Sequence, residues 1–228
     1  MTPTLVLTRP EAQSRALARE IGPGVRVIVS PVLEIAAAGP PPTLDGSAAV
    51  ILTSASAAPF CPGLAGVSAY CVGAKTAHAA REKGARVHLA ARDADDLVAR
   101  LLAARADVPQ PLVHLRGTHA RGDIAARLEA GGISCKEAVI YDQRPLPLTD
   151  EARAALSGTD PAVLPLYSPR SARLVAEGLD EVGPAVRVLA LSPAVAQAWE
   201  GATGHAAQTI PAPDGKEMLA AIRAALRA

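Results

Sequence analysis

The chain has 228 residues, half of which are apolar, so it can bury one large core or two smaller ones and is not a disordered segment. Its 23 basic and 22 acidic residues give a formal net charge of +1, so a charged ligand has to be held by local groups. Aromatic residues make up only 2% of the chain and no basic block is present, which excludes a surface for nucleic acid.

The N-terminal part of the sequence predicts a strand, a helix and a second strand. Residues 4–8 form a short apolar run that is typical of a fully buried strand. Pro10 and Glu11 then favour a helix start, because proline suits the first helical position and an acidic residue suits the first turn. This helix is expected to end at the Gly-Pro-Gly of residues 22–24, and residues 25–29 form the next strand.

The middle of the chain alternates short strands with helices. Most of these strands lead into a helix that begins with a small or hydroxyl residue, and several helices end at glycine. The expected strands cover residues 49–54, 67–73, 86–89 and 112–116, and the expected helices cover an alanine-rich stretch after residue 54 and residues 75–84, 95–104 and 117–129.

The C-terminal part of the chain continues this alternation. An extra helix over residues 146–156 comes first. Strand–helix units follow, and such units predict parallel sheets with right-handed crossovers. The expected strands cover residues 163–168, 186–192 and 206–210, and the last two helices cover residues 194–204 and 215–226.

The order of these units repeats after about half of the chain. The unit at residues 4–29 is similar to the one at 112–138, and the units that begin at 49, 67 and 86 are similar to those that begin at 163, 186 and 206. We therefore expect an α/β protein with two similar lobes, each a five-stranded parallel sheet flanked by helices. Because the residues themselves match weakly, either an internal duplication or a coincidence among alanine-rich units explains the repeat.

Two extended stretches are expected to connect the lobes. Residues 25–35 and 134–145 each have a β-branched apolar centre and are followed by prolines that stop regular structure. We predict that these stretches run antiparallel as a two-stranded linker. The lobes then comprise residues 1–32 together with 148–228, and residues 36–142.

The carboxyl ends of the expected strands carry the candidate ligand-binding residues. Ligands of open α/β sheets bind at this edge, where the N–H groups and the dipole of each helix start attract anions. Hydroxyl, small and basic residues gather there in both lobes, which favours a ligand with several carboxylates. The alternative is that each serine is a plain helix N-cap, the commoner role for any one of them. The candidates are Arg9, Thr53, Ser54, Ser56, Lys75, Thr76, Arg116, Ser168, Arg170, Ser171, Ser192 and Ala194.

Other kinds of chemistry are not indicated. Cys61, Cys71 and Cys135 form neither a metal pattern nor a disulfide framework, so we interpret them as buried thiols of a cytoplasmic protein. No histidine pair has zinc-ligand spacing, and no dinucleotide fingerprint or P-loop is present, so we expect neither a metal nor a cofactor. The first strand begins near the N-terminus and arginines interrupt the apolar runs, so we expect no signal peptide and no membrane partner.

Tyr141 and His114 each allow two interpretations. Tyr141 is the polar aromatic residue of the returning linker stretch, and it is either a packed strand tyrosine or a catalytic group. Because it follows Val139 and Ile140 on a strand, alternation allows its side chain to face a cleft. His114 lies within an expected strand, which favours a place in the core over a functional role.

The sequence resembles the uroporphyrinogen-III synthase family along nearly its whole length. Each motif that carries the resemblance is weakly specific, but their order and spacing are typical of the family. The motifs are Leu-Val-Leu-Thr-Arg-Pro at residues 5–10, Pro-Val-Leu-Glu-Ile at 31–35, Ile-Leu-Thr-Ser at 51–54, Val-Gly-Ala-Lys-Thr-Ala at 72–77, Asp-Asp-Leu at 95–97, Leu-Arg-Gly at 115–117, Val-Ile-Tyr at 139–141 and Tyr-Ser-Pro at 167–169.

The resemblance implies two α/β lobes joined by a two-stranded ladder, with the active site between the lobes. It also implies a cofactor-free lyase of tetrapyrrole and heme biosynthesis that closes hydroxymethylbilane, a linear tetrapyrrole polycarboxylate, with inversion of ring D and loss of water. We expect this small molecule to be the partner of a monomeric protein that binds neither nucleic acid nor membranes.

The resemblance also assigns roles to individual residues. The Val-Ile-Tyr motif puts the active-site tyrosine of the family at Tyr141, whose phenol would protonate the departing hydroxide. The other motifs put substrate contacts at Thr53, Ser54, Thr76 and Ser168.

One motif departs from the pattern of the family. Members commonly have Gly-Pro-Thr-Thr-Ala where this chain has Ser-Pro-Ala-Val-Ala at residues 192–196, so side-chain hydroxyls are lost while the N–H groups of the helix start remain. The Ala-Ser-Ala-Ala-Pro stretch at residues 55–59 is also unusual. These departures leave an alternative open, a non-catalytic two-lobed protein derived from this family that binds a polycarboxylate.

Overall fold

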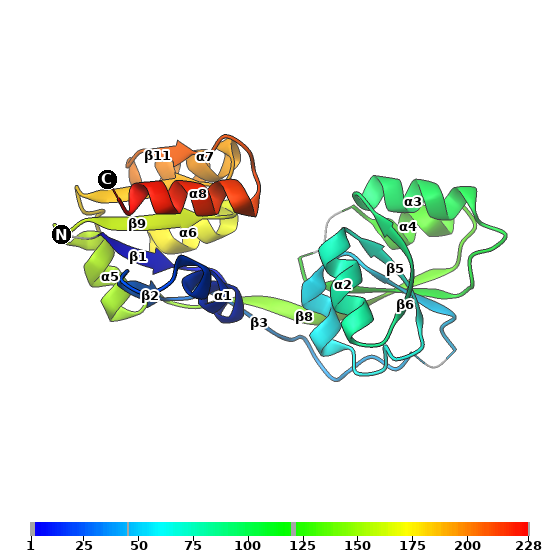
Figure 1. The fold of residues 1–228 in the computed structure, drawn as a ribbon. Coiled ribbons are helices and arrows are strands. Elements are labelled where there is room, and N and C mark those ends of the chain that lie inside the picture. The colour runs from blue at the N-terminus through cyan, green and yellow to red at the C-terminus, as the bar shows by residue number, and fades with distance from the viewer. Residues whose placement is uncertain (1–2, 45, 120–121, 228) are drawn as a thin grey trace. The chain divides into compact units, whose positions relative to one another are not determined.

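The structure is a computed structural model that describes residues 3–44, 46–119 and 122–227. The chain divides into two compact units, which Figure 1 shows with their helices and strands. Unit 1 comprises Met1–Glu34 and Arg144–Ala228, and unit 2 comprises Ile35–Gln143. Each unit contains mostly parallel strands flanked by helices, so the predicted α/β class is confirmed.

Unit 1 contains a five-stranded sheet in which every pair of neighbouring strands is parallel. Its strands, in spatial order, are β11 (Ala207–Thr209), β10 (Val186–Ala190), β9 (Ala162–Leu166), β1 (Thr4–Leu7) and β2 (Val27–Val29). Its helices are α1 (Glu11–Ile21), α5 (Asp150–Ser157), α6 (Pro169–Glu177), α7 (Pro193–Thr203) and α8 (Gly215–Ala225).

Both faces of this sheet are covered by helices, as the alternation of side chains along β1 requires. Val6 belongs to a core shared with α5, α6 and α7, in which Trp199 is the largest fully buried residue. Leu5 and Leu7 point to the opposite face and belong to a core shared with α1 and α8, which includes Met218. The central strands β1 and β9 are therefore buried from both sides, which explains their continuous apolar runs.

Unit 2 contains the second sheet, which has six strands. In spatial order they are β3 (Leu33–Ala37), β8 (Cys135–Pro145), β7 (Leu112–Gly117), β4 (Ala49–Leu52), β5 (Ser68–Val72) and β6 (Arg86–Ala91). Its helices are the 3₁₀ helix η1 (Ala55–Phe60), α2 (Ala74–Glu82), α3 (Ala94–Ala103) and α4 (Ile124–Ala130).

The two faces of the second sheet also bury separate cores. Ile51 packs into a core with Leu97 of α3 and Leu128 of α4. The neighbouring Val50 and Leu52 face the other side, where the core includes alanines of η1 and α2. Successive side chains of a strand point to opposite faces of the sheet. The register between neighbouring strands therefore decides which functional residues lie on the same face.

The two sheets have the same spatial order of strands. The order β11-β10-β9-β1-β2 in unit 1 corresponds to β6-β5-β4-β7-β8 in unit 2. The strands that open unit 1 along the chain, β1 and β2, thus correspond to β7 and β8, which come last in unit 2. This is the permuted correspondence that the sequence predicts.

The two linker stretches run antiparallel as predicted, but they belong to the second sheet and do not form a separate ladder. The amide of Ala38 donates to the carbonyl of Ile140 (3.2 Å) and that of Leu146 to the carbonyl of Val32 (2.9 Å), so the two stretches run in opposite directions. However, β3 is the edge strand next to β8 in the six-stranded sheet. The ladder continues this sheet, because the eleven residues of β8 pair first with β7 and then extend past it.

Several element boundaries are also corrected. The helix predicted for residues 117–129 begins only at Ile124, after Gly122 and Asp123 adopt positive φ angles of 98° and 41° that interrupt a helical path. The helix predicted for residues 146–156 begins at Asp150, where the Thr149 side chain accepts a hydrogen bond from the amide of Ala152 (3.2 Å). The alanine-rich stretch after residue 54 forms the short 3₁₀ helix η1, which contains a proline.

In the part of the chain that the structure describes, no helix is both long and apolar enough to cross a membrane.

Candidate functional site

The candidate residues of unit 2 lie at the carboxyl ends of three adjacent strands, β7, β4 and β5. Thr53 and Ser54 come directly after β4, and the Ser54 hydroxyl caps η1 by accepting a hydrogen bond from the amide of Ser56 (3.2 Å). Ser54 is therefore an N-cap, as the plainer interpretation of the sequence expects. Its hydroxyl and its carbonyl organise the turn, because they accept hydrogen bonds from the amides of Ser56 and Ala57.

The loop after β5 forms the start of helix α2. Gly73 adopts a positive φ of 79° at the N-cap and provides no side-chain cap, so the first amides of the helix are left for a ligand or water. Lys75 is exposed in this first turn, whereas Thr76 is buried with 6% of its surface exposed. A carboxylate at this helix start would meet amides and an ammonium group together.

Arg116 is held by groups of its own unit. Its Nε atom donates to Glu137 Oε2 (2.8 Å), and its Nη1 atom donates to the carbonyl of Gly117 (3.0 Å). The guanidinium is therefore not available as a bare anion receptor, although 22% of the side chain is exposed. Glu137, which no motif of the sequence indicates, lies opposite His114 in the register of β7 and β8.

His114 connects this ion pair to Thr53. Its Nε2 atom lies 3.3 Å from Thr53 Oγ1, and its Nδ1 atom lies 3.6 Å from Glu137 Oε1. The residue is 1% exposed, which confirms its predicted place in the core. Burial lowers the pKa of His114, Glu137 opposes this effect and the charge of Arg116 adds to it, so the ring is neutral at pH 7.

Tyr141 does not follow the alternation that the sequence predicts for it. The register between β7 and β8 shifts between Arg116 and Gly117, which leaves Ile140 as the extra residue of a β-bulge. Ile140 and Tyr141 consequently belong to the same core, and Val139 is the exposed side chain. Such bulges re-aim a side chain at the end of a pairing and are frequent beside active sites.

The Tyr141 ring is positioned by two neighbours. It stacks on Phe60 with the ring centroids 6.2 Å apart, and it lies against Gly117, whose missing side chain makes room for it. The residue is 7% exposed. In the described residues, only atoms of His114 and Trp199 are both fully buried and without a hydrogen-bond partner, so the phenol oxygen of Tyr141 keeps either solvent contact or a partner.

In unit 1, Arg9 follows β1 and lies over the ring of Tyr167, which follows the adjacent strand β9. The guanidinium carbon is 4.2 Å from the ring centroid, a cation–π contact that fixes the arginine side chain. The carbonyl of Arg9 accepts a hydrogen bond from the fully buried Ser14 hydroxyl (2.8 Å). Burial raises the pKa of Tyr167, an effect that Arg9 opposes, so the phenol is neutral at pH 7.

Helix α6 begins beside this pair with Ser168 as its N-cap. The Ser168 hydroxyl accepts from the amide of Ser171 (3.1 Å) and donates to the hydroxyl of Ser171 (2.9 Å). Both serines are half-buried, as is Arg170 in the same turn. The structure thus places Arg9, Ser168, Arg170 and Ser171 at one edge, where β1 and β9 end.

Helix α7, after the next strand, contains the stretch that departs from the family pattern. Ser192 is its N-cap residue and makes no side-chain cap hydrogen bond. Ala194 is exposed in the first turn, whereas Val195 is 1% exposed and packs in the core with Trp199. Only position 194 therefore presents a surface on which a lost hydroxyl would matter to a ligand.

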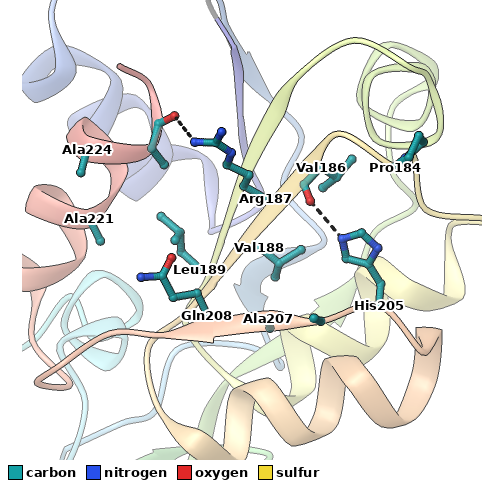
Figure 2. Close-up of a pocket in the computed structure, with 12 residues that line it drawn as sticks. Pro184, Val186, Arg187, Val188, Leu189, His205, Ala207, Gln208, Ala221 and Ala224 are labelled. Atoms are coloured by element: carbon teal, nitrogen blue, oxygen red, sulfur yellow. Dashed lines mark hydrogen bonds between the residues drawn. The ribbon is translucent and has the colours of Figure 1, made fainter. Parts of the chain in front are cut away.

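A pocket of about 630 Å³ lies elsewhere in unit 1, and Figure 2 shows its lining. Its walls come from the first residues of β10, from β11 and from the last turns of α8. Two polar side chains of this pocket are hydrogen-bonded to backbone carbonyls. The His205 ring bonds that of Val186 (2.9 Å), and the Arg187 guanidinium bonds that of Ala225 (3.4 Å). None of the predicted binding residues lines this pocket.

Comparison with known proteins decides the family. A family model described as uroporphyrinogen-III synthase HemD matches residues 14–220. The chain belongs to the uroporphyrinogen-III synthase family. The family acts in tetrapyrrole biosynthesis, in agreement with the resemblance seen in the sequence. None of the curated proteins matches this chain.

Solved structures of this family share the fold. The uroporphyrinogen-III synthetase of Helicobacter pylori is 16% identical, with a TM-score of 0.69 over 97% of this chain and 99% of that one. A mutant uroporphyrinogen III synthase from the extremely thermophilic bacterium Thermus thermophilus is 18% identical, with a TM-score of 0.54 over 99% of both chains. At these identities the likeness concerns the fold.

Proposed function

We propose that this chain is a uroporphyrinogen-III synthase that cyclises hydroxymethylbilane with inversion of ring D and loss of water. The match to the family model supports this most directly, and the residues at the edges of the two sheets agree with it. In each unit, the carboxyl ends of three adjacent strands carry hydroxyl or basic residues, and most of these strands lead directly into a helix start. A substrate with many carboxylates needs such repeated anion-binding positions.

In this proposal the enzyme mainly holds a flexible substrate in one geometry. The hydroxyl of the terminal hydroxymethyl group of hydroxymethylbilane leaves as water after it is protonated, and the pyrrole nitrogen loses its proton, so the remaining methylene carbon becomes part of an electron-poor azafulvene. Ring D then attacks through its substituted carbon, and the resulting spiro intermediate reopens and closes inverted. Holding both ends of the chain together supplies a large part of the rate enhancement, because it removes the entropy cost of bringing them into contact.

We assign the carboxylate contacts to the two sheet edges. In unit 2 these contacts are the amides after β4 and the α2 start with Lys75 and Thr76. In unit 1 they are Arg9 beside Tyr167 and the α6 start with Ser168. The amide of Ala194 at the α7 start provides a further contact, without a side-chain hydroxyl.

We assign proton donation to the Tyr141 phenol. The bulge at Ile140 and the space above Gly117 hold its ring in one position. A phenol O–H group in a fixed position can protonate the departing hydroxide. Backbone amides at the sheet edge stabilise negative charge on the substrate and complete the site.

The alternative is a protein of this family that binds a polycarboxylate without catalysis. The absence of a side-chain hydroxyl at Ala194 is the reason to consider it. Mixing the protein with hydroxymethylbilane separates the two, because the type I isomer forms spontaneously. Accumulation of the type III isomer supports the synthase. Binding of the substrate with only type I product supports the alternative.

A further inference from the structure

The row Thr53, His114, Glu137 and Arg116 spans three adjacent strands on one face of the unit 2 sheet. His114 lies opposite Ile51 of β4 and Glu137 of β8, and Ile51 and Thr53 share a face because they are two residues apart. Among the residues that the structure describes, His114 Nδ1 is one of two fully buried side-chain atoms that lack a hydrogen-bond partner.

The distances distinguish the two nitrogens of the His114 ring. Nε2 is within hydrogen-bond distance of Thr53 Oγ1 (3.3 Å), whereas Nδ1 is 3.6 Å from Glu137 Oε1. The other carboxylate oxygen, Oε2, is already bound by Arg116 at 2.8 Å. Glu137 therefore presents one acceptor oxygen to the histidine, and a neutral imidazole carries a proton on one nitrogen only.

Electrostatics selects the nitrogen that carries the proton. A bare Nδ1 lone pair facing a carboxylate in a buried position would be repelled, whereas an Nδ1–H group is attracted to it. The charged groups that act on the ring are Glu137 from β8 and Arg116 from its own strand, and Thr53 after β4 is uncharged. The Cys135 thiol of β8 donates to the carbonyl of Lys136, and burial raises its pKa to about 11, so it is neutral.

We propose that Glu137 holds His114 in the Nδ1-protonated tautomer, so that Thr53 donates its hydroxyl proton to Nε2 and offers the substrate only its lone pairs. Thr53 then accepts a hydrogen bond from a pyrrole N–H or from the hydroxymethyl O–H of the substrate, and does not donate to a carboxylate. His114 is thereby a positioning residue that acts through Thr53. The statement about the substrate rests on the proposed function, whereas the statement about the tautomer does not.

Long-range proton–nitrogen NMR of the ¹⁵N-labelled protein tests the tautomer directly at neutral pH, without substrate. The chain has five histidines, and single substitutions of His78, His88, His119 and His205 by Gln identify the His114 resonances by elimination, so no variant of the buried residue is needed. We expect a protonated Nδ1 and an unprotonated Nε2. A protonated Nε2, alone or together with Nδ1, would overturn the proposal.

A matched pair of variants tests the role of Glu137 in the same spectrum. Glu137→Leu removes the acceptor, and we expect the Nε2-protonated form to appear, whereas His88→Gln on β6 leaves the His114 signals unchanged. An unchanged Nδ1-protonated ring in Glu137→Leu would contradict the role of the carboxylate.

Kinetics then tests what Thr53 does for the substrate. Thr53→Ser keeps the acceptor and Thr53→Val removes it at nearly constant shape. We expect KM for hydroxymethylbilane to rise about tenfold in Thr53→Val, the effect of one lost hydrogen bond, and to stay near the parent value in Thr53→Ser. Parent KM and kcat in Thr53→Val would refute the contact. If the parent protein makes no type III isomer, the proposed function fails while the NMR result stands.

Discussion

The ring of Tyr141 occupies the space that a side chain on Gly117 would need. A β-carbon built on Gly117 would lie 2.6 Å from both the Cε2 and Cζ atoms of the ring, closer than real contacts allow. The two residues are directly paired across β7 and β8 after the bulge. Glycine in a strand often marks such a close approach, and at the end of β7 it permits the position of the proposed proton donor.

Gly117→Ala should therefore displace Tyr141. We expect a loss of about 1–3 kcal/mol in the free energy of unfolding from overpacking, measured by urea denaturation, together with a fall in turnover. Gly39→Ala is the matched control in the same unit, since nothing lies within 4 Å of a β-carbon there. If both variants behave alike, the close approach has no consequence.

Tyr141→Phe should reduce turnover and leave binding and stability nearly intact. The ring still stacks on Phe60, and the carboxylates are held elsewhere, so only the transferable proton is lost. A positioned acid contributes roughly 10²–10⁴-fold, and we expect an effect at the lower end because backbone amides share the work. The measurement is kcat for formation of the type III isomer.

Tyr70→Phe is the control for this experiment. Tyr70 is buried in the other core of unit 2, with 8% of its surface exposed, and has no proposed role in the reaction. Its variant should turn over at the parent rate. A Tyr141→Phe protein that also keeps the parent rate would show that positioning alone carries the catalysis.

His114 should make the stability of the protein depend on pH. Because burial lowers its pKa, the unfolded chain binds a proton more readily than the folded chain below about pH 6.5, the ordinary value for histidine. Its contribution is complete above that pH and is lost as the pH falls toward the lowered pKa. Compared with the parent, His114→Gln should lose less unfolding free energy on acidification through this range.

Urea denaturation at pH values above and below 6.5 measures this difference, with about 6.5 taken as the midpoint for the unfolded chain. His88→Gln serves as the control, since its side chain is exposed and is hydrogen-bonded to the uncharged Ser68. The parent and the His88→Gln protein should show the same pH dependence. An identical dependence in His114→Gln would mean that the buried ring does not titrate in this range.

Positions 194 and 195 should respond oppositely to the hydroxyls that are common in the family. Ala194 is exposed at the α7 start, so Ala194→Thr should fold normally and should lower KM for hydroxymethylbilane. Val195 is fully buried beside Trp199, so Val195→Thr should lose about 1–3 kcal/mol of unfolding free energy through a desolvated hydroxyl. Equal effects of the two changes would contradict their assigned environments.

The sequence was sufficient to predict the α/β class and the strands that precede the candidate serines, because both follow from local patterns. Strands such as β1 and β4 are continuous apolar runs, and the serines that follow β4 and β9 are N-caps with recognisable spacing. The correspondence of β1 with β7 was visible for the same reason.

What the sequence did not show depends on contacts between distant residues. The bulge at Ile140 arises from the pairing of β7 with β8, so Tyr141 shares a core with Ile140, which simple alternation along the strand does not predict. Glu137 alternates like any solvent-facing strand residue, and only the sheet register brings it to His114. The cation–π contact of Arg9 with Tyr167 likewise joins two neighbouring strands from opposite ends of the chain.

The isomer of uroporphyrinogen that forms from hydroxymethylbilane tests the central claim most directly. The parent protein and a protein-free control are incubated with fresh substrate, and the products are oxidised and separated as type I and type III porphyrins. We predict that the type III isomer dominates with the protein and that type I dominates without it. A type I product at the same rate in both samples would contradict the assignment of this chain as a synthase.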